Sequence, residues 1–214
     1  AEVPQQSPRL QLGAADYVTP ELFERLLPHS DQEFRLLLLL ARYAGVRVPS
    51  ESHALVCADV DLGGRRITVP DQKRRTSHPV RVVPIRRELL TELAERLAKA
   101  QEGNQPLLAL SRFNLHKKLE AVCDLAGVSE WPRPFQALRR SCESQWRREG
   151  IPSNAIGQWL GHSPTVGDSH YDANGDFWME KATNLNSAGA QWKAQCALSG
   201  TTGNGREVGK RAIG

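Results

Sequence analysis

Apolar residues recur every three to four positions through most of this chain, which is the spacing of one face of an α-helix. The pattern predicts helices over roughly 20–27, 31–44, 88–100, 112–126, 134–149 and 154–160. Suitable start and stop signals flank several of them: Ser30 with Glu33 forms a capping box, Ser153 is an expected N-cap, and Gly45 and Gly161 end helices.

Residues 55–85 follow a different pattern. Val56–Asp61, Arg66–Val69 and Val80–Ile85 are short runs rich in β-branched residues, which predict strands. Gly63-Gly64 is a hairpin signal between the first two runs. The expected fold class is therefore α+β: mainly helical, with a small antiparallel β-sheet.

Composition limits the number of domains and the environment. The 214 residues, 40% of them hydrophobic, suffice for one domain with a sizeable core. We expect residues 1–16 to be a flexible arm or linker and residues 186–214 to be a flexible, polar tail. The net charge of +4 permits a polyanionic partner without requiring one.

The cysteines indicate a reducing compartment. Cys57, Cys123, Cys142 and Cys196 are widely spaced and form no CxxC pair, so we interpret them as reduced residues of an intracellular protein. No apolar run reaches membrane-spanning length, and no secretory signal is present. We therefore expect a cytoplasmic protein without a membrane segment. There is no metal-ligand cluster in the sequence, and we expect no metal and no cofactor.

Candidate chemistry concentrates near the C-terminus. Gln136 and Arg139 are three residues apart on one predicted helix and can reach the same point in space. Gly161 ends the next helix, which places His162 on a tight turn, and Tyr171 follows nine residues later. Each residue alone also has an ordinary interpretation: a solvated arginine, a polar turn, and a tyrosine packed at the edge of a core.

A further arginine and a basic segment lie earlier in the chain. Arg47 directly follows a buried helix and a glycine turn, which places it at the rim of the core; a surface pair with Glu51 is the alternative. The predicted hairpin region is strongly basic, a composition suited either to a phosphate backbone or to a solvated loop. Its cations are Arg65, Arg66, Lys73, Arg74, Arg75, Arg81, Arg86 and Arg87.

The order of these residues resembles the tyrosine recombinases, the phage-type integrase family. That family has a His-x-x-Arg box, then Leu-Gly-His, then a nucleophilic tyrosine; the matching segments are Gln136-Ala-Leu-Arg139, Leu160-Gly161-His162 and Tyr171. The family's first catalytic arginine lies in a Gly-x-Arg-x-x-x-Glu context, which Arg47 matches. Its catalytic lysine lies in a hairpin turn, where Lys73 is the best positional match.

The resemblance implies a tyrosine recombinase catalytic-domain fold over residues 17–185. It also implies a site-specific recombinase or integrase that cleaves and rejoins double-stranded DNA through a 3′-phosphotyrosyl intermediate, without ATP or metal. The expected catalytic residues are Tyr171 as nucleophile, with Arg47, Arg139, His162, Lys73 and Gln136. The expected DNA contacts are Arg65, Arg66, Arg74, Arg75 and Arg140.

The resemblance further implies a homo-oligomer, a tetramer on DNA, in which residues 176–195 pass to a neighbouring subunit; a tail folded on its own domain, or disordered, is the alternative. The chain departs from the family at Gln136, where a histidine is expected, because glutamine cannot titrate. This departure keeps open a catalytically impaired DNA-binding relative. A type IB topoisomerase-like enzyme with the same chemistry is the other alternative.

Overall fold

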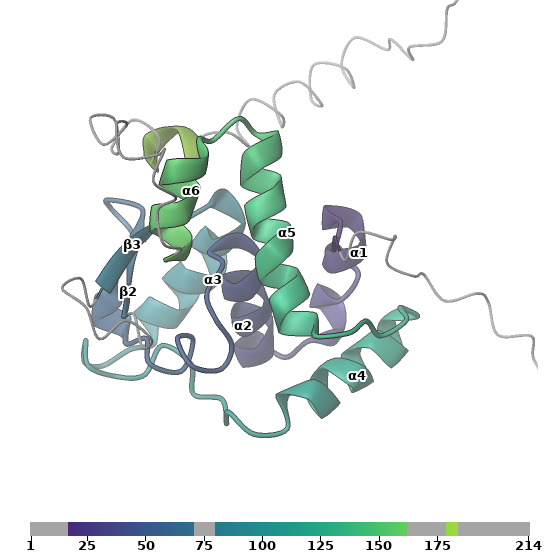
Figure 1. Ribbon diagram of the computed structural model, residues 1–214. Helices are drawn as coiled ribbons and strands as arrows, with labels where there is room; N and C mark the ends of the chain where they lie inside the picture. Colours follow the sequence, from purple (N-terminus) through teal and green to yellow (C-terminus); the bar gives the residue numbers. More distant parts are fainter. Residues whose placement is uncertain (1–16, 71–79, 162–178, 184–214) are drawn as a thin grey trace, which may run out of the picture.

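Helix α2 (Gln32–Tyr43) lies at the centre of the domain (Figure 1). It contacts α3 (Arg87–Ala98) on one side and α5 (Pro134–Arg148) on the other. Every residue from Leu36 to Tyr43 is buried, as expected for a helix surrounded by other elements. The predicted leucine-rich helix is therefore confirmed, and it is the element around which the others pack.

The computed structural model describes residues 17–70, 80–161 and 179–183. The remaining helices are α1 (Pro20–Glu24), the 3₁₀ helices η1 (Leu27–His29) and η2 (Cys57–Asp59), α4 (Leu115–Ala126) and α6 (Ser153–Leu160). The strands are β1 (Val60–Asp61), β2 (Arg66–Pro70) and β3 (Val80–Pro84).

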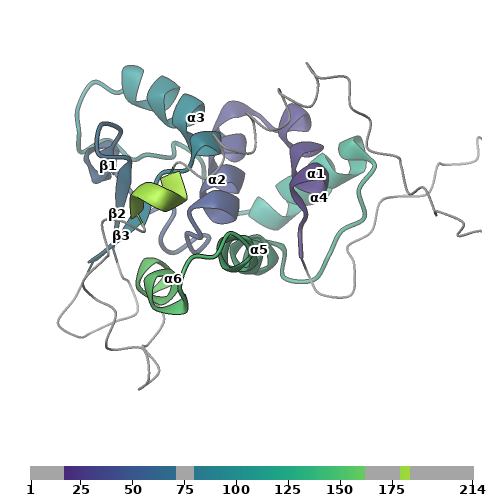
Figure 2. The ribbon, with the colours of Figure 1, turned by 90° about the horizontal axis from the view of Figure 1, so that it is seen from above.

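The strands form one antiparallel sheet in the order β1-β2-β3. Ile67 pairs with Val83, and Val69 pairs with Arg81. These four side chains are buried, whereas Val80 and Val82 on the alternate positions of β3 are exposed. Helix α6 packs on β3, and Figure 2 shows it beside α5 as well. The predicted fold class, mainly helical with a small antiparallel sheet, is confirmed.

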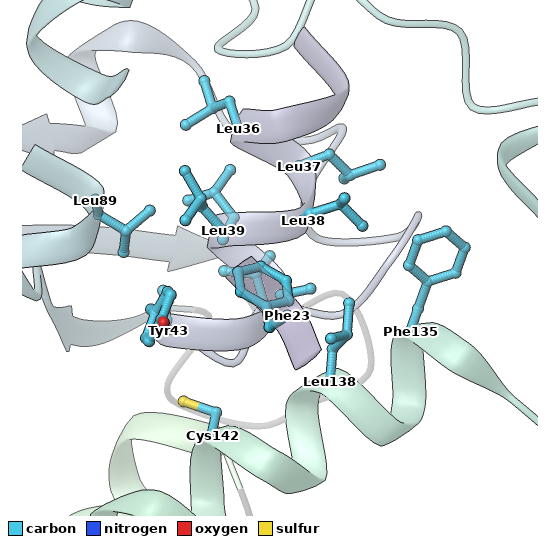
Figure 3. Packing of buried hydrophobic residues seen from close by; sticks show 14 of the residues in the cluster. Phe23, Leu36, Leu37, Leu38, Leu39, Tyr43, Leu89, Phe135, Leu138 and Cys142 are labelled. Carbon is cyan, nitrogen blue, oxygen red and sulfur yellow. The ribbon is translucent and has the colours of Figure 1, made fainter. Parts of the chain in front are cut away.

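Aromatic and aliphatic side chains join the helices. In Figure 3, Leu138 and Cys142 of α5 lie in the same core as the leucines of α2 and Leu89 of α3. Phe23 meets Tyr43 edge to face at 5.6 Å between ring centroids. Burying this much apolar surface is the main stabilising contribution to the fold.

The end of α5 is tied to α6 and to α3. Trp146 meets Trp159 of α6 edge to face, at 5.1 Å between ring centroids. The guanidinium of Arg86, the N-cap residue of α3, is paired with Glu149 just after α5. These contacts hold the N-terminus of α3 and the last turn of α6 against the C-terminal end of α5.

Three local predictions were wrong. The N-cap of α2 is Asp31, which accepts a hydrogen bond from Phe34 N at 2.9 Å, whereas Ser30 donates to Leu26 O. The N-cap position of α6 is Pro152 rather than Ser153. In the run 56–61 only Val60–Asp61 is a strand, and Cys57–Asp59 forms the 3₁₀ helix η2, because Val56 N donates to the Asp59 side chain and the segment turns before it can extend.

Residues 179–183 pack on their own domain. The side chain of Ala182 is buried in the core, and Arg65 Nη1 donates to Thr183 O at 3.4 Å. A cavity of about 310 Å³ beside the β1–β2 turn is lined by Gly63, Gly64, Arg65, Arg66, Met179, Glu180 and Thr183. In the part of the chain that the structure describes, no helix is both long and apolar enough to cross a membrane.

Candidate functional site

The carboxylate of Glu51 is the centre of a cluster of arginines. Its side chain is fully buried. Arg81 donates to it from two nitrogens, with Nη1 at 2.8 Å from Oε1 and Nη2 at 2.6 Å from Oε2. The backbone N–H of Arg47 donates to Oε2 at 2.8 Å, and Arg47 Nη1 forms a close ion pair with Oε1. Arg139 Nη1 lies 3.7 Å from Oε2.

The turn after α2 places Arg47 and Glu51 together. Gly45 adopts a φ of +61°, a left-handed conformation that glycine tolerates best. The carbonyl of Arg47 then accepts hydrogen bonds from Glu51 N at 2.9 Å and Ser52 N at 3.1 Å. This tight turn brings the side chain of Glu51 next to the backbone N–H of Arg47. The predicted pair of Arg47 and Glu51 exists, but it is part of a larger cluster at the rim of the core.

Arg139 reaches the same place from α5. Its Nη1 and Nη2 form close hydrogen bonds with the carbonyls of Gly45 and Leu160. Burial, together with the positive charges of Arg47 and Arg81, lowers the pKa of Arg139 to about 10, although Glu51 opposes this shift. The guanidinium is thus still charged near neutral pH, in a position where an additional negative charge would be favourable.

Arg81 completes the cluster from the sheet. Its side chain lies on the inward face of β3 and is 7% exposed. In addition to Glu51, its Nε donates to Trp159 O at 2.6 Å. Trp159 and Leu160 form the last turn of α6, where helix carbonyls lack intrahelical donors and the helix dipole is negative. Two arginines from different elements therefore bind consecutive carbonyls at one helix end.

The cluster is electropositive. Three guanidinium groups face one carboxylate, which leaves a net charge of +2 on these four side chains. Burial tends to raise the pKa of Glu51, but hydrogen bonds and charge from Arg81 and Arg47 outweigh it and hold the pKa below its ordinary value. Glu51 therefore stays ionised and orients the arginines, whose planar forks suit the oxygens of a phosphate.

The structure brings two of the predicted catalytic residues together, Arg47 and Arg139. Gln136 lies one turn before Arg139 on α5 and is exposed. Lys73, His162 and Tyr171 lie outside the described residues, as do Arg74 and Arg75. Arg66 and Arg140 are exposed, and Arg65 is half-buried beside residues 179–183.

Sequence reasoning missed the role of Arg81, which it counted only among the basic residues of the hairpin. A signal was present in the strand pattern. Side chains alternate between faces along a strand, so Arg81 shares a face with Val83, which is buried. A charged residue on the inward face of a strand needs a partner, because burying an unpaired charge is costly. In the structure, Glu51 is the acidic partner of Arg81.

The domain therefore places three guanidinium groups around one buried carboxylate, an arrangement with the charge and the donors to attract an anion. The comparisons define the class further. The model of the phage integrase family matches residues 16–174, and the chain belongs to this family. A search of curated proteins found no match.

Several solved structures share the fold. The XerA recombinase aligns with a TM-score of 0.56 at 22% identity, covering 84% of this chain and 64% of that one. The catalytic domain of bacteriophage HP1 integrase aligns with a TM-score of 0.50 at 18% identity, covering 89% of this chain and 94% of that one. The Tn1549 transposon integrase, solved in complex with transposon right end DNA, aligns with a TM-score of 0.53 at 16% identity. This alignment covers 89% of this chain and 67% of the Tn1549 integrase chain. The chain thus spans slightly less than two thirds of the XerA recombinase and nearly all of the HP1 catalytic domain.

Proposed function

We propose that this chain is the catalytic domain of a site-specific DNA recombinase or integrase that cleaves and rejoins strands through a 3′-phosphotyrosyl intermediate. The observation that carries this proposal is the convergence of Arg47 and Arg139 on Glu51, in a chain of the phage integrase family. Its proposed domain extends over residues 17–185. Double-stranded DNA is the proposed partner; the Tn1549 integrase was solved in complex with transposon right end DNA.

Arg47 and Arg139 act on the scissile phosphate in this proposal. Attack on a phosphodiester increases the negative charge on the non-bridging oxygens in the transition state, and preorganised donors stabilise that charge. A guanidinium has five N–H donors, and carbonyls take two hydrogen bonds from Arg139. The same side chain can therefore be held by protein and still donate to a phosphate. His162 adds a further hydrogen bond.

The remaining roles fall on residues beyond the described part of the chain. The Tyr171 phenol loses its proton to water, and its oxygen attacks the phosphorus. The bond from phosphorus to the 5′ oxygen breaks, and Lys73 gives this leaving oxygen a proton as general acid. The products are a 3′-phosphotyrosyl link and a free 5′ hydroxyl. Because the covalent link retains the phosphodiester's energy, rejoining needs no ATP.

Arg65, Arg66, Arg74, Arg75 and Arg140 are the proposed contacts to the DNA backbone. A tetramer on DNA, formed through the C-terminal segment, is the proposed assembly. The exposed Gln136 supports one second candidate, a DNA-binding relative with weakened catalysis, because it puts a group that cannot titrate one turn from Arg139.

A suicide substrate tests the proposal. A pool of duplexes from the flanks of the gene, nicked so that rejoining is blocked, would be incubated with the protein and examined for a denaturant-resistant adduct. We expect an adduct with the wild-type chain and none with Tyr171→Phe. DNA binding without any adduct would instead favour the impaired relative, and an adduct that survives Tyr171→Phe would show that another residue is the nucleophile.

A further inference from the structure

Arg81 makes contacts that the proposed chemistry does not use. All three of its guanidinium nitrogens have partners: Nη1 and Nη2 donate to Glu51, and Nε donates to Trp159 O. Its side chain is nearly fully buried, between the turn after α2 and the last turn of α6. Such a residue is in place to orient other groups rather than to contact DNA.

Each partner of Arg81 also supports one arginine of the site. Glu51 holds the backbone N–H and the side chain of Arg47. Trp159 precedes Leu160, whose carbonyl accepts from Arg139. Arg81 therefore holds both the Glu51 carboxylate, which binds Arg47, and the C-terminal end of α6, which binds Arg139.

We propose that Arg81 is a positioning residue that sets the relative placement of Arg47 and Arg139 through Glu51 and the C-terminal end of α6. The inference rests on the proposed function in one respect: it takes the scissile phosphate of DNA as the anion that Arg47 and Arg139 bind. Arg81 itself does not touch the reacting atoms. Its effect is on preorganisation: a displacement of about 1 Å in a catalytic group can cost about 100-fold in rate.

A matched control exists in the same chain. Arg86 is also buried, and it also pairs with a carboxylate through both Nη atoms, at 2.6 and 2.8 Å from Glu149. This pair joins the start of α3 to the end of α5 and contacts none of the residues in the arginine cluster through the hydrogen bonds of its guanidinium. Arg86→Met therefore reports the general effect of losing a buried arginine.

The experiment compares Arg81→Met, Arg86→Met and wild type by two readouts. The first is the single-turnover rate of adduct formation on the suicide substrate at saturating DNA, alongside the Kd for the same DNA. The second needs no catalysis: the Kd of inorganic phosphate for the protein, measured by calorimetry. Thermal unfolding of each variant monitors stability.

We expect Arg81→Met to slow adduct formation by about 100-fold and to weaken phosphate binding at least about tenfold, with the Kd for DNA changed by less than about threefold. Arg86→Met should lower the melting temperature but leave both readouts near wild type. The acid side of the pH–rate profile should also move to higher pH in Arg81→Met only. In that variant Glu51 loses the charge of Arg81 and, among the described residues, keeps those of Arg47 from its own turn and Arg139 from α5, so it takes up a proton more readily.

The outcomes separate the two proposals. Phosphate binding that depends on Arg81, in a wild-type protein that forms no adduct, would refute the recombinase function and retain the positioning role. Equal effects of Arg81→Met and Arg86→Met on both readouts would overturn the positioning role. A wild-type chain that neither binds phosphate nor forms an adduct would overturn both.

A second variant covers the case in which Arg81→Met does not fold. Arg81→Lys keeps the charge but cannot make the three directed contacts of a guanidinium. We expect a folded protein with a cleavage rate at least about tenfold below wild type. Wild-type cleavage by Arg81→Lys would show that charge alone suffices, and would contradict the positioning role.

Discussion

A methyl group on Gly45 would occupy the space taken by the side chain of Leu160. The end of α2 and the end of α6 therefore touch at this glycine, and the carbonyls of both residues accept hydrogen bonds from Arg139. The close approach of the two chain segments is what lets one guanidinium bind both.

Gly45→Ala should be strongly destabilising for two separate reasons. A side chain at a φ of +61° costs about 1–2 kcal/mol, and overpacking against Leu160 costs about 1–3 kcal/mol more. Urea unfolding would measure the free energy of unfolding. Gly150→Ala separates the two effects, because it has a φ of +78° but no heavy atom within 4 Å of its added Cβ; it should lose only about 1–2 kcal/mol.

Gly157→Ala is the opposite control, because this glycine lies inside α6 and its added Cβ also meets no atom within 4 Å. Alanine is the better helix former, so the variant should gain about 0.5–1 kcal/mol. A Gly45→Ala protein no less stable than Gly150→Ala would contradict the close packing of α2 against α6.

Glu51→Gln should reduce stability in a pH-dependent way. The pKa of Glu51 is held below its ordinary value of 4.5 in the folded chain, so below that pH the unfolded chain binds protons first and folding weakens. The stability that Glu51 contributes is therefore present above pH 4.5 and lost as the pH falls through the lowered pKa. The difference in free energy of unfolding between wild type and Glu51→Gln should become smaller as the pH falls below 4.5. Urea unfolding at a series of pH values would measure it.

Glu143→Gln is the matched control for that experiment. Glu143 forms an ion pair with Arg147 on the surface of α5 at 2.9 Å. Because exposed pairs contribute little, its loss should cost less than about 1 kcal/mol at neutral and acidic pH alike. A Glu51→Gln deficit that stays constant with pH would mean that Glu51 is not ionised in the folded chain.

Arg139→Lys and Arg147→Lys, two substitutions on α5, should differ in their effect on the cleavage rate. Lysine keeps the charge at 139 but cannot hold the carbonyls of Gly45 and Leu160 and a phosphate in one plane, so cleavage should fall by about 10²–10³-fold. Arg147 is exposed on the same helix, where it pairs with Glu143 and has no proposed role in binding DNA, so Arg147→Lys should leave the single-turnover rate within about threefold. Equal losses in the two variants would argue against a phosphate clamp at Arg139.

Gln136→His should increase the cleavage rate. The position is exposed one turn before Arg139, so the substitution needs no rearrangement of the core. Histidine adds a group that can hold or transfer a proton near neutral pH, which contributes up to about 10²–10⁴-fold where proton transfer limits the rate. Gln136→Leu has similar size and serves as the control. An unchanged rate in Gln136→His would show that this position does not limit the chemistry.

Much of the fold was predictable because its helices carry strong local signals. The helix predicted over 134–149 forms as α5, with Leu138, Cys142 and Trp146 buried along it, and Gly161 ends α6 with a φ of +66° as expected. The N-caps failed by one residue at Ser30 and Ser153, since adjacent residues offer similar capping chemistry and tertiary packing decides between them.

The site was only partly predictable. Arg47 and Arg139 were identified from the resemblance, and neither their spacing nor the composition of the chain shows that they meet. The role of Arg81 depends on strand register: it faces inward because it pairs with Val69. The pairing register of β3 depends on strand β2 and on the buried Glu51 from another segment. Neither can be inferred from the sequence of β3 alone.

The arginine cluster has a consequence for the order in which the protein matures. Arg47 and Glu51 meet within one local turn. The contacts that Arg81 and Arg139 add join residues 30, 78 and 94 positions apart in the chain, so these cannot form from local structure alone. During synthesis, Arg47 and Glu51 leave the ribosome well before α6 exists, and at that stage neither Arg81 nor Arg139 has a helix end to bind. A nascent chain therefore has no assembled arginine cluster, and any activity that depends on this cluster should arise only with the last cooperative step of folding.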